Sequence, residues 1–170
     1  VSGDELGVSA GEIAVENGYA QLKLKVGDDP ATDVKRIRCV GEAIPDSVSL
    51  KVDVNQAWGD VKTALSVLEK VEALIDVVEQ PVASRNVADL RLLRERTSVP
   101  VMPDESVESA ADAMNLIKQG AGDIFNIKLM KAGGVTGAVQ LNTVAEADHR
   151  CTQLGSMVEG HVGTAAGVHF

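Results

Sequence analysis

Aromatic side chains are scarce in this 170-residue chain, of which Phe, Trp and Tyr make up only 2%. Any core must therefore be built from Val, Leu, Ile and Ala, a composition that suits helices packed closely against a sheet. Hydrophobic residues still reach 45% of the sequence, which excludes a disordered chain. The length is that of one domain able to bury a core.

The sequence also lacks the features of membrane, secreted and nucleic-acid-binding proteins. No apolar run approaches the roughly 20 residues of a membrane-spanning helix, and residues 1–10 show no signal peptide. Acidic residues outnumber basic ones 25 to 16, for a net charge of −9, which argues against nucleic-acid and anionic-membrane surfaces. We therefore expect a cytoplasmic protein with no nucleic-acid or membrane partner.

Cysteine is equally scarce. Cys39 and Cys151 lie far apart and form no CxxC pair. In a reducing cytoplasm, two buried thiols are expected rather than a disulfide or a metal site.

Short β-branched runs alternate with amphipathic stretches along the chain. Strands are expected at 20–26, 48–54, 75–79, 99–102, 123–128 and 151–157, and helices at 31–44, 60–74, 86–96, 107–122 and 135–148. Asp60 is a candidate N-cap and Gly120 a candidate helix stop. The alternation predicts an α/β fold with a parallel sheet. Because no glycine-rich nucleotide-binding motif follows any strand, a (β/α) TIM-type barrel is favoured over a doubly wound sheet.

Charged residues recur at the ends of these strands. Successive members of the series are 28, 26, 25 and 24 residues apart: Lys25, Asp53, Glu79, Asp104 and Lys128. A spacing of one βα unit places them at the same end of successive strands. Active sites of βα barrels lie at the C-terminal ends of the strands, so the spacing predicts a site there.

Three members of the series are acids. Asp53, Glu79 and Asp104 would repel one another when crowded together unless a cation neutralised them. Carboxylate oxygens without thiolate or imidazole indicate a hard ion, Mg²⁺ before Mn²⁺ or Ca²⁺. The alternative is three unrelated loop acids that cap helices or form exposed ion pairs.

The lysines indicate proton transfer. Lys23 and Lys25 project to one side of their strand, which faces water in an ordinary amphipathic strand but faces inward in a barrel. Lys25 and Lys128 would then stand on opposite faces of a substrate held on the metal. Such a site suits removal of a proton α to a carboxylate, because the metal stabilises the enolate. One lysine takes the proton, and the other returns one from the opposite face; alternatively, one lysine acts alone and a leaving group departs.

The sequence resembles the enolase superfamily, and within it the muconate-lactonising subgroup. The resemblance spans nearly the whole chain and rests on 23-KLK-25, 53-DVN-55, 79-EQP-81, 104-DES-106, 126-NIKLMKAGG-134 and 155-GSMVEGHVGTAAGVHF-170. It implies a Mg²⁺-dependent isomerase, with Mn²⁺ as a possible substitute.

The resemblance also implies a role for each site residue. The metal ligands would be Asp53, Glu79 and Asp104, and the acid/base catalysts would be Lys25 and Lys128. Lys23 and Glu159 would lie next to the substrate. Asn55 and Glu105 would support the site, with Glu105 paired to Lys128. Trp58 is either a pocket wall or a packing residue, and His161 either lines the site or begins a helix.

One departure from the family concerns the extent of the chain. Residues 1–170 resemble a partial barrel catalytic domain of about six βα units, and nothing in them resembles the family's N-terminal capping domain or its closing strand.

The implied function is a dipeptide or acyl-amino-acid epimerase acting on a small carboxylate, homo-oligomeric in the intact enzyme. A muconate-type cycloisomerase is the alternative, as is a non-catalytic barrel fragment that acts in assembly. A phosphate-binding barrel, supported by 133-GG-134, would leave the three acids unexplained.

Overall fold

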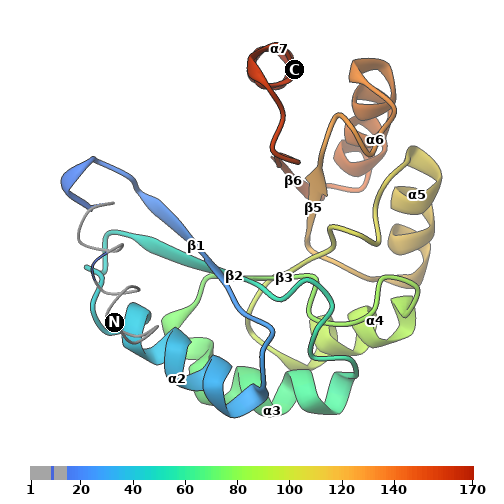
Figure 1. The fold of residues 1–170 in the computed structure, drawn as a ribbon. Helices are drawn as coiled ribbons and strands as arrows, with labels where there is room; N and C mark the ends of the chain where they lie inside the picture. Colours follow the sequence, from blue (N-terminus) through green and yellow to red (C-terminus); the bar gives the residue numbers. More distant parts are fainter. Residues whose placement is uncertain (1–8, 10–14) are drawn as a thin grey trace.

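The computed structural model describes residue 9 and residues 15–170, in which strands and helices alternate (Figure 1). Most of residues 1–10, on which the expected absence of a signal peptide rests, therefore lies outside the described residues. The strands are β1 (Gln21–Lys25), β2 (Ser49–Asp53), β3 (Val77–Glu79), β4 (Val101–Met102), β5 (Ile124–Ile127) and β6 (Cys151–Leu154). The helices are α2 (Pro30–Gly41), α3 (Val61–Val71), the 3₁₀ turn η1 (Glu72–Leu74), α4 (Val87–Arg96), α5 (Ala110–Gln119), α6 (Val135–Ala147) and α7 (His161–Val168).

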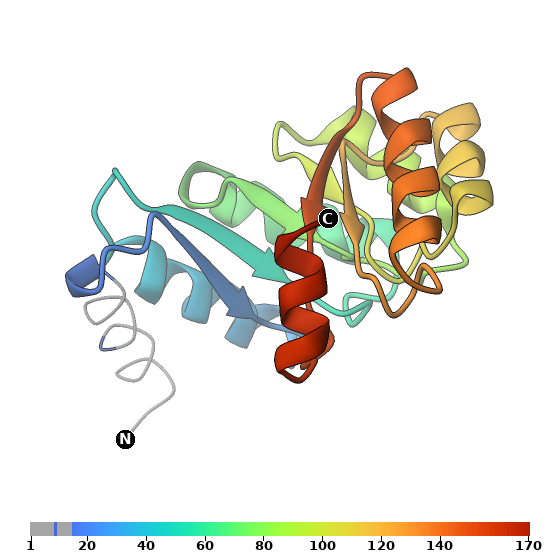
Figure 2. The same cartoon turned by 90° about the horizontal axis from the view of Figure 1, so that it is seen from above.

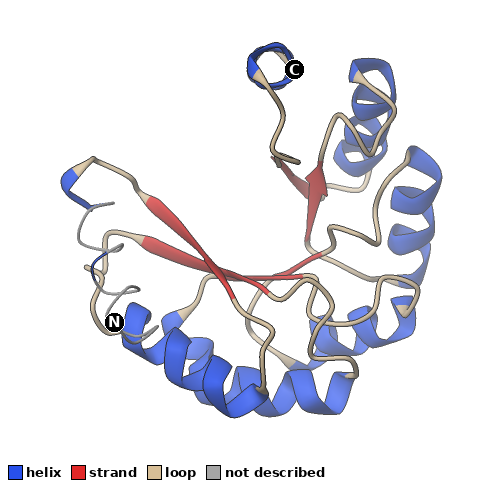
Figure 3. Cartoon of the chain, viewed as in Figure 1, coloured by secondary structure: helices blue, strands red, loops and turns tan. Residues whose placement is uncertain are grey.

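All the described strand pairs are parallel. One sheet has the order β1-β2-β3-β4 and a second pairs β5 with β6. The backbone amides of Asp123 and Asn126 donate to the carbonyls of Val101 and Pro103 at 2.8 and 3.0 Å. β5 therefore lies beside β4 and extends the order of parallel strands. Figures 1 and 3 show the strands along the inside of an arc with α2 to α6 on its outer side. The predicted α/β fold and partial (β/α) barrel are therefore confirmed.

The element boundaries follow from local chemistry. The Asp60 side chain accepts hydrogen bonds from the amides of Lys62 and Thr63 and so caps α3, as predicted. Gly120 ends α5 in the left-handed conformation, with a φ of 70°. α7 begins at His161, which agrees with a helix-start role for that residue.

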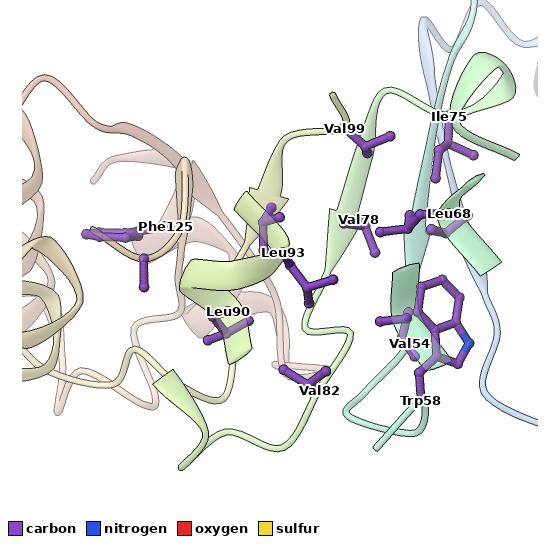
Figure 4. Close-up of a cluster of buried hydrophobic side chains, with 14 of the residues drawn as sticks. Val54, Trp58, Leu68, Ile75, Val78, Val82, Leu90, Leu93, Val99 and Phe125 are labelled. Atoms are coloured by element: carbon purple, nitrogen blue, oxygen red, sulfur yellow. The ribbon is translucent and has the colours of Figure 1, made fainter. Parts of the chain in front are cut away.

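The core lies between the strands and the outer helices and is largely aliphatic, as the composition predicts. Figure 4 shows Leu68, Leu90 and Leu93 facing strand residues such as Val78. Trp58 is only 3% exposed, and its indole Nε1 donates to Asp33 Oδ2 at 2.8 Å. Trp58 is therefore a packing residue rather than a pocket wall.

The ends of the arc are less covered. Cys151 begins β6, which has a neighbour on one side only within the described residues, and its side chain is exposed, whereas Cys39 on α2 is part-buried. Both cysteines are thiols, but the prediction that both are buried is wrong, because an edge strand covered on one side leaves its residues open to solvent. Figure 2 shows α5 and α6 side by side and α7 standing apart from them. In the part of the chain that the structure describes, no helix has the length and apolar character to cross a bilayer.

Candidate active site

The C-terminal ends of the first three strands carry charged residues in one row. Lys25 of β1 lies in register with Asp53 of β2, and Asp53 lies in register with Glu79 of β3. In the same row, Glu79 is paired with Met102 of β4, and Asp104 follows two residues later. Residues two apart on an extended chain face the same side. The structure thus brings the predicted residues to one edge of the sheet.

The three acids are buried, and lysines neutralise two of them directly from β1. Asp53 and Glu79 are each 0% exposed and Asp104 is 1% exposed. Lys23 Nζ lies 2.7 Å from Asp53 Oδ2 and 2.8 Å from Glu79 Oε2, while Lys25 Nζ lies 2.5 Å from Asp53 Oδ2. A buried carboxylate is stable as an anion only with such partners.

These contacts set the protonation of the pair formed by Lys23 and Asp53. Burial opposes the charge on Asp53, but hydrogen bonds from Lys23 and Lys25 outweigh it and lower the pKa of the carboxyl. Burial likewise opposes the charge on Lys23, but hydrogen bonds to Asp53 and Glu79 raise the pKa of its ammonium. Both groups are therefore charged at neutral pH.

Asp104 is held by two further lysines. Lys128 Nζ lies 2.5 Å from Asp104 Oδ2, and Lys131 Nζ lies 2.6 Å from Asp104 Oδ1. Burial would raise the pKa of Asp104, but hydrogen bonds from Lys128 and Lys131 lower it overall. Lys128 was predicted from its strand end, whereas Lys131 was not, because it lies in the turn after β5 rather than on a strand.

Two other buried residues of the site were missed by the sequence interpretation. Lys51 is 2% exposed, its Nζ lies 3.3 Å from Glu79 Oε2, and burial lowers its pKa. Its position two residues before Asp53 was a usable signal, because it faces the same side of β2. Asn126 Nδ2 donates to Glu79 Oε1 at 2.8 Å. A Cβ at position 155 would lie 2.3 Å from Asn126 Oδ1, so a larger residue there would displace the Asn126 amide.

Asn55 and Glu105 connect the loop after β2 to the loop after β4, next to the row of strand-end charges. Lys25 Nζ donates to Asn55 Oδ1 at 2.5 Å, and Asn55 Nδ2 donates to Glu105 Oε1 at 3.1 Å. Asn55 adopts a positive φ of 44°, a conformation that asparagine tolerates better than most residues. The expected ion pair between Lys128 and Glu105 is wrong, because Lys128 pairs with Asp104.

Gln80 fixes the loop that carries Asp104, and the sequence interpretation also missed it. Gln80 is fully buried with a φ of 39°, and its Oε1 accepts from the amides of Asp104 and Ser106 at 2.9 and 3.1 Å. Its Nε2 donates to Val82 O and to Ser106 Oγ, both at 2.9 Å. The side chain therefore uses all four of its hydrogen-bonding positions.

Glu159 lies in the loop between β6 and α7. Its Oε2 accepts hydrogen bonds from Ser156 Oγ and from the Met157 amide, the latter at 2.8 Å. The bond from Ser156 contributes most to lowering the pKa of Glu159, and the charge of Lys128 adds to it. A cavity of about 160 Å³ beside Glu159 is bordered by Leu154 and α7, away from the buried acids.

Asp53, Glu79 and Asp104 are chemically suited to bind a hard metal ion, but their side chains are not arranged around a common metal position in this structure. No group of three or more His, Cys, Asp or Glu side chains within the described ranges is arranged to hold a metal ion, and lysine ammonium groups lie against the acids. Glu79 Oε2 and Asn126 Oδ1 are buried and accept no well-aligned hydrogen bond, although the former is ion-paired with Lys23 and Lys51. Three carboxylates, one of which has a buried oxygen without a hydrogen-bond partner, are a suitable donor set for Mg²⁺.

The fold and the row of strand-end charges define a (β/α)-barrel domain with its polar site at the C-terminal edge of the strands. Residues 5–170 match the family described as Enolase C-terminal domain-like, and the chain belongs to this family.

Individual relatives include epimerases and cycloisomerases. The chain is 42% identical over 160 residues to an L-Ala-D/L-Glu epimerase from Clostridium acetobutylicum, covering 92% of this chain and 44% of that protein. It is 36% identical over 162 residues to a chloromuconate cycloisomerase from Pseudomonas sp. (strain P51), covering 95% and 44%. A dipeptide epimerase from Enterococcus faecalis V583, solved in complex with Mg and the dipeptide L-Leu-L-Tyr, superposes with a TM-score of 0.94 at 32% identity, covering 99% and 48%. The chain thus spans about half the length of these relatives.

Proposed function

We propose that the protein is an enolase-superfamily isomerase that removes and returns the proton α to a carboxylate, acting as an epimerase or racemase on a dipeptide or an acyl-amino acid. The observation that carries the proposal is the row of Lys25, Asp53 and Glu79 across three parallel strands, with Asp104 beyond the fourth. The names of the epimerase relatives support the same reaction class.

Asp53, Glu79 and Asp104 would hold Mg²⁺, and Mn²⁺ would suit the same oxygen donors. The bound ion would supply positive charge beside the substrate carboxylate, where negative charge develops as the proton leaves. Lys23 now neutralises both Asp53 and Glu79 from one side. With a metal ion bound to the two acids, Lys23 would be free to contact the substrate carboxylate.

The local charge favours an anionic substrate although the chain as a whole is acidic. The cluster formed by the three buried acids and the five lysines around them carries an excess of two positive charges, apart from Glu105 and Glu159 in the surrounding loops; the lysines are Lys23, Lys25, Lys51, Lys128 and Lys131. A cationic site concentrates carboxylates from solution. This arrangement reconciles the net charge of −9 with a small carboxylate substrate.

Lys25 and Lys128 would exchange the proton. Lys25 Nζ stands at the end of β1, and its side chain is 62% exposed and open to a ligand. Lys128 follows β5, on the other arm of the arc, with its side chain 10% exposed. One Nζ removes the α-proton from one face and the other Nζ delivers a proton to the opposite face, which inverts the carbon. Glu159, within electrostatic reach of Lys128, would lie at the edge of the substrate.

The test is exchange of the α-proton in deuterated water, followed by NMR with L-Ala-L-Glu and an N-acylated amino acid in the presence of Mg²⁺. Exchange is expected with the unaltered protein. Loss of a general acid or base lowers rates by roughly 10²–10⁴-fold, so epimerisation by Lys25→Ala and by Lys128→Ala should be slowed to that extent, while exchange without inversion should be lost only in the variant that lacks the lysine facing the α-proton of the substrate used. Lys62→Ala, at an exposed position on α3, is the control. Equal epimerisation by Lys25→Ala and the unaltered protein would remove Lys25 from the mechanism.

A muconate-type cycloisomerase is the second candidate, favoured by the 36% identity to the chloromuconate enzyme. It predicts loss of muconate ultraviolet absorbance on incubation with the protein and Mg²⁺, without α-proton exchange in the dipeptide. A non-catalytic piece that acts in assembly would give neither reaction.

Sedimentation of the intact protein tests the predicted homo-oligomer, and cell fractionation tests the predicted cytoplasmic location.

A further inference from the structure

Lys131 is a buried cation that takes no part in the proposed proton transfer. Its side chain is 8% exposed, and its Nζ lies 2.6 Å from Asp104 Oδ1. The same ammonium donates to three backbone carbonyls, those of Asp104, Val107 and Asn126, the last two at 3.1 and 3.3 Å. An ammonium has only three protons, so four acceptors use its full donor capacity. Lys131 therefore has no proton available for a substrate.

These contacts determine which oxygen of Asp104 faces the site. Lys131 binds Oδ1 and the carbonyl of the same residue, while Gln80 Oε1 accepts from the Asp104 amide. Asp104 is thus fixed at its amide, its carbonyl and one carboxylate oxygen. The other oxygen, Oδ2, points toward Lys128 at 2.5 Å.

We propose that Lys131 is a positioning residue that presents Asp104 Oδ2 to the metal, an inference that rests on the proposed function. Lys131 also ties β5, through Asn126 O, to the loop after β4, through Val107 O. The contacts with both segments would hold Asp104 in place when a bound metal ion displaces Lys23 and Lys25 from the other acids. Residues that orient a ligand from behind typically contribute 10- to 100-fold to metal affinity.

Electrostatics alone predicts the opposite sign. If Lys131 acted only as a nearby positive charge, its removal would strengthen Mg²⁺ binding, because two cations repel. If Lys131 positions Asp104, its removal weakens binding even though a repulsive charge is lost. The direction of the change in affinity therefore separates the two roles.

The test is titration calorimetry of Mg²⁺ into the unaltered protein, Lys131→Met and Lys118→Met. Lys118 is an exposed lysine on α5, so its variant removes the same charge away from the site. We expect Lys131→Met to bind Mg²⁺ roughly 10-fold more weakly and Lys118→Met to bind it like the unaltered protein. In the exchange assay, raising the Mg²⁺ concentration should restore the rate of Lys131→Met, because the defect lies in metal binding.

Each outcome decides a different point. Absence of Mg²⁺ binding by the unaltered protein contradicts the proposed function and not the role of Lys131 in particular. Unchanged or tighter binding by folded Lys131→Met overturns the positioning role. If that variant does not fold, Lys131→Gln, which keeps two donors, takes its place, and weaker binding than that of the unaltered protein is again expected, by a smaller factor. Loss of folding in both variants, with Lys118→Met intact, assigns Lys131 to folding alone and also overturns the proposal.

Discussion

Replacing Gln80 with glutamate should destabilise the fold strongly although the two side chains have the same shape. In Gln80→Glu an oxygen replaces Nε2, the atom that donates to Val82 O and Ser106 Oγ at 2.9 Å each. Two hydrogen bonds are lost at about 1 kcal/mol each. The new oxygen also faces the Val82 carbonyl at a position with 0% exposure, where an unsatisfied acceptor costs about 1–3 kcal/mol. Together these losses amount to about 3 kcal/mol or more.

A loss of that size is easily measured. For a chain of this length, 1 kcal/mol shifts the melting temperature by about 2–4 °C, so Gln80→Glu should melt roughly 6–12 °C below the unaltered protein. Thermal melting followed by circular dichroism at pH 7 is the assay. Gln140→Glu makes the same chemical change at an exposed site on α6 and should melt normally. If the two variants melted within about 2 °C of each other, the role assigned to the Gln80 network would be refuted.

Two further predictions concern stability. Trp58→Phe keeps an aromatic ring in the core but removes the N–H that donates to the fully buried Asp33; the free energy of unfolding should fall by about 1–3 kcal/mol in urea titrations, and no change would contradict the importance of that bond. Stability should also depend on pH at both extremes. The lowered pKa of Asp53, caused by hydrogen bonds from Lys23 and Lys25 that outweigh burial, stabilises the fold above the ordinary value of 3.8, and this contribution is lost as the pH falls through the folded pKa. The raised pKa of Lys23 stabilises the fold fully below 10.5, and this contribution is lost as the pH rises through the folded value. Urea midpoints should therefore decline below about pH 4 and above about pH 10.5, and Asp53→Asn should lose part of the acid decline; a midpoint that stayed constant down to pH 2 would contradict the assigned ion pairs.

The architecture was predictable because it depends on repeated, local signals. The alternation of strand and helix patterns, the cap at Asp60 and the stop at Gly120 all act within a few residues, and the structure confirms them. The 24- to 28-residue spacing of the strand-end charges placed Asp53 and Glu79 correctly on neighbouring strands. These signals depend on fold geometry more than on particular side-chain contacts.

The contacts within the site were less predictable. Lys51, Gln80 and Lys131 are polar residues whose burial depends on partners 24 to 28 residues away in the sequence. No periodic pattern marks Lys131, which lies in a turn, and Gln80 combines a positive φ with a fully hydrogen-bonded side chain, which its sequence neighbours do not indicate. Cys151 was misjudged for a related reason: the exposure of an edge strand depends on what lies beside it, not on its own composition.

Asp53, Glu79 and Asp104 are proposed to hold one divalent cation together, and a crystal structure of the protein with Mg²⁺ would show whether they do. We expect a single ion within about 2.0–2.1 Å of oxygen atoms from all three carboxylates, with the ammonium groups of Lys23 and Lys25 displaced from Asp53. An ion bound elsewhere, or Lys25 still paired with Asp53 at a saturating Mg²⁺ concentration, would contradict it.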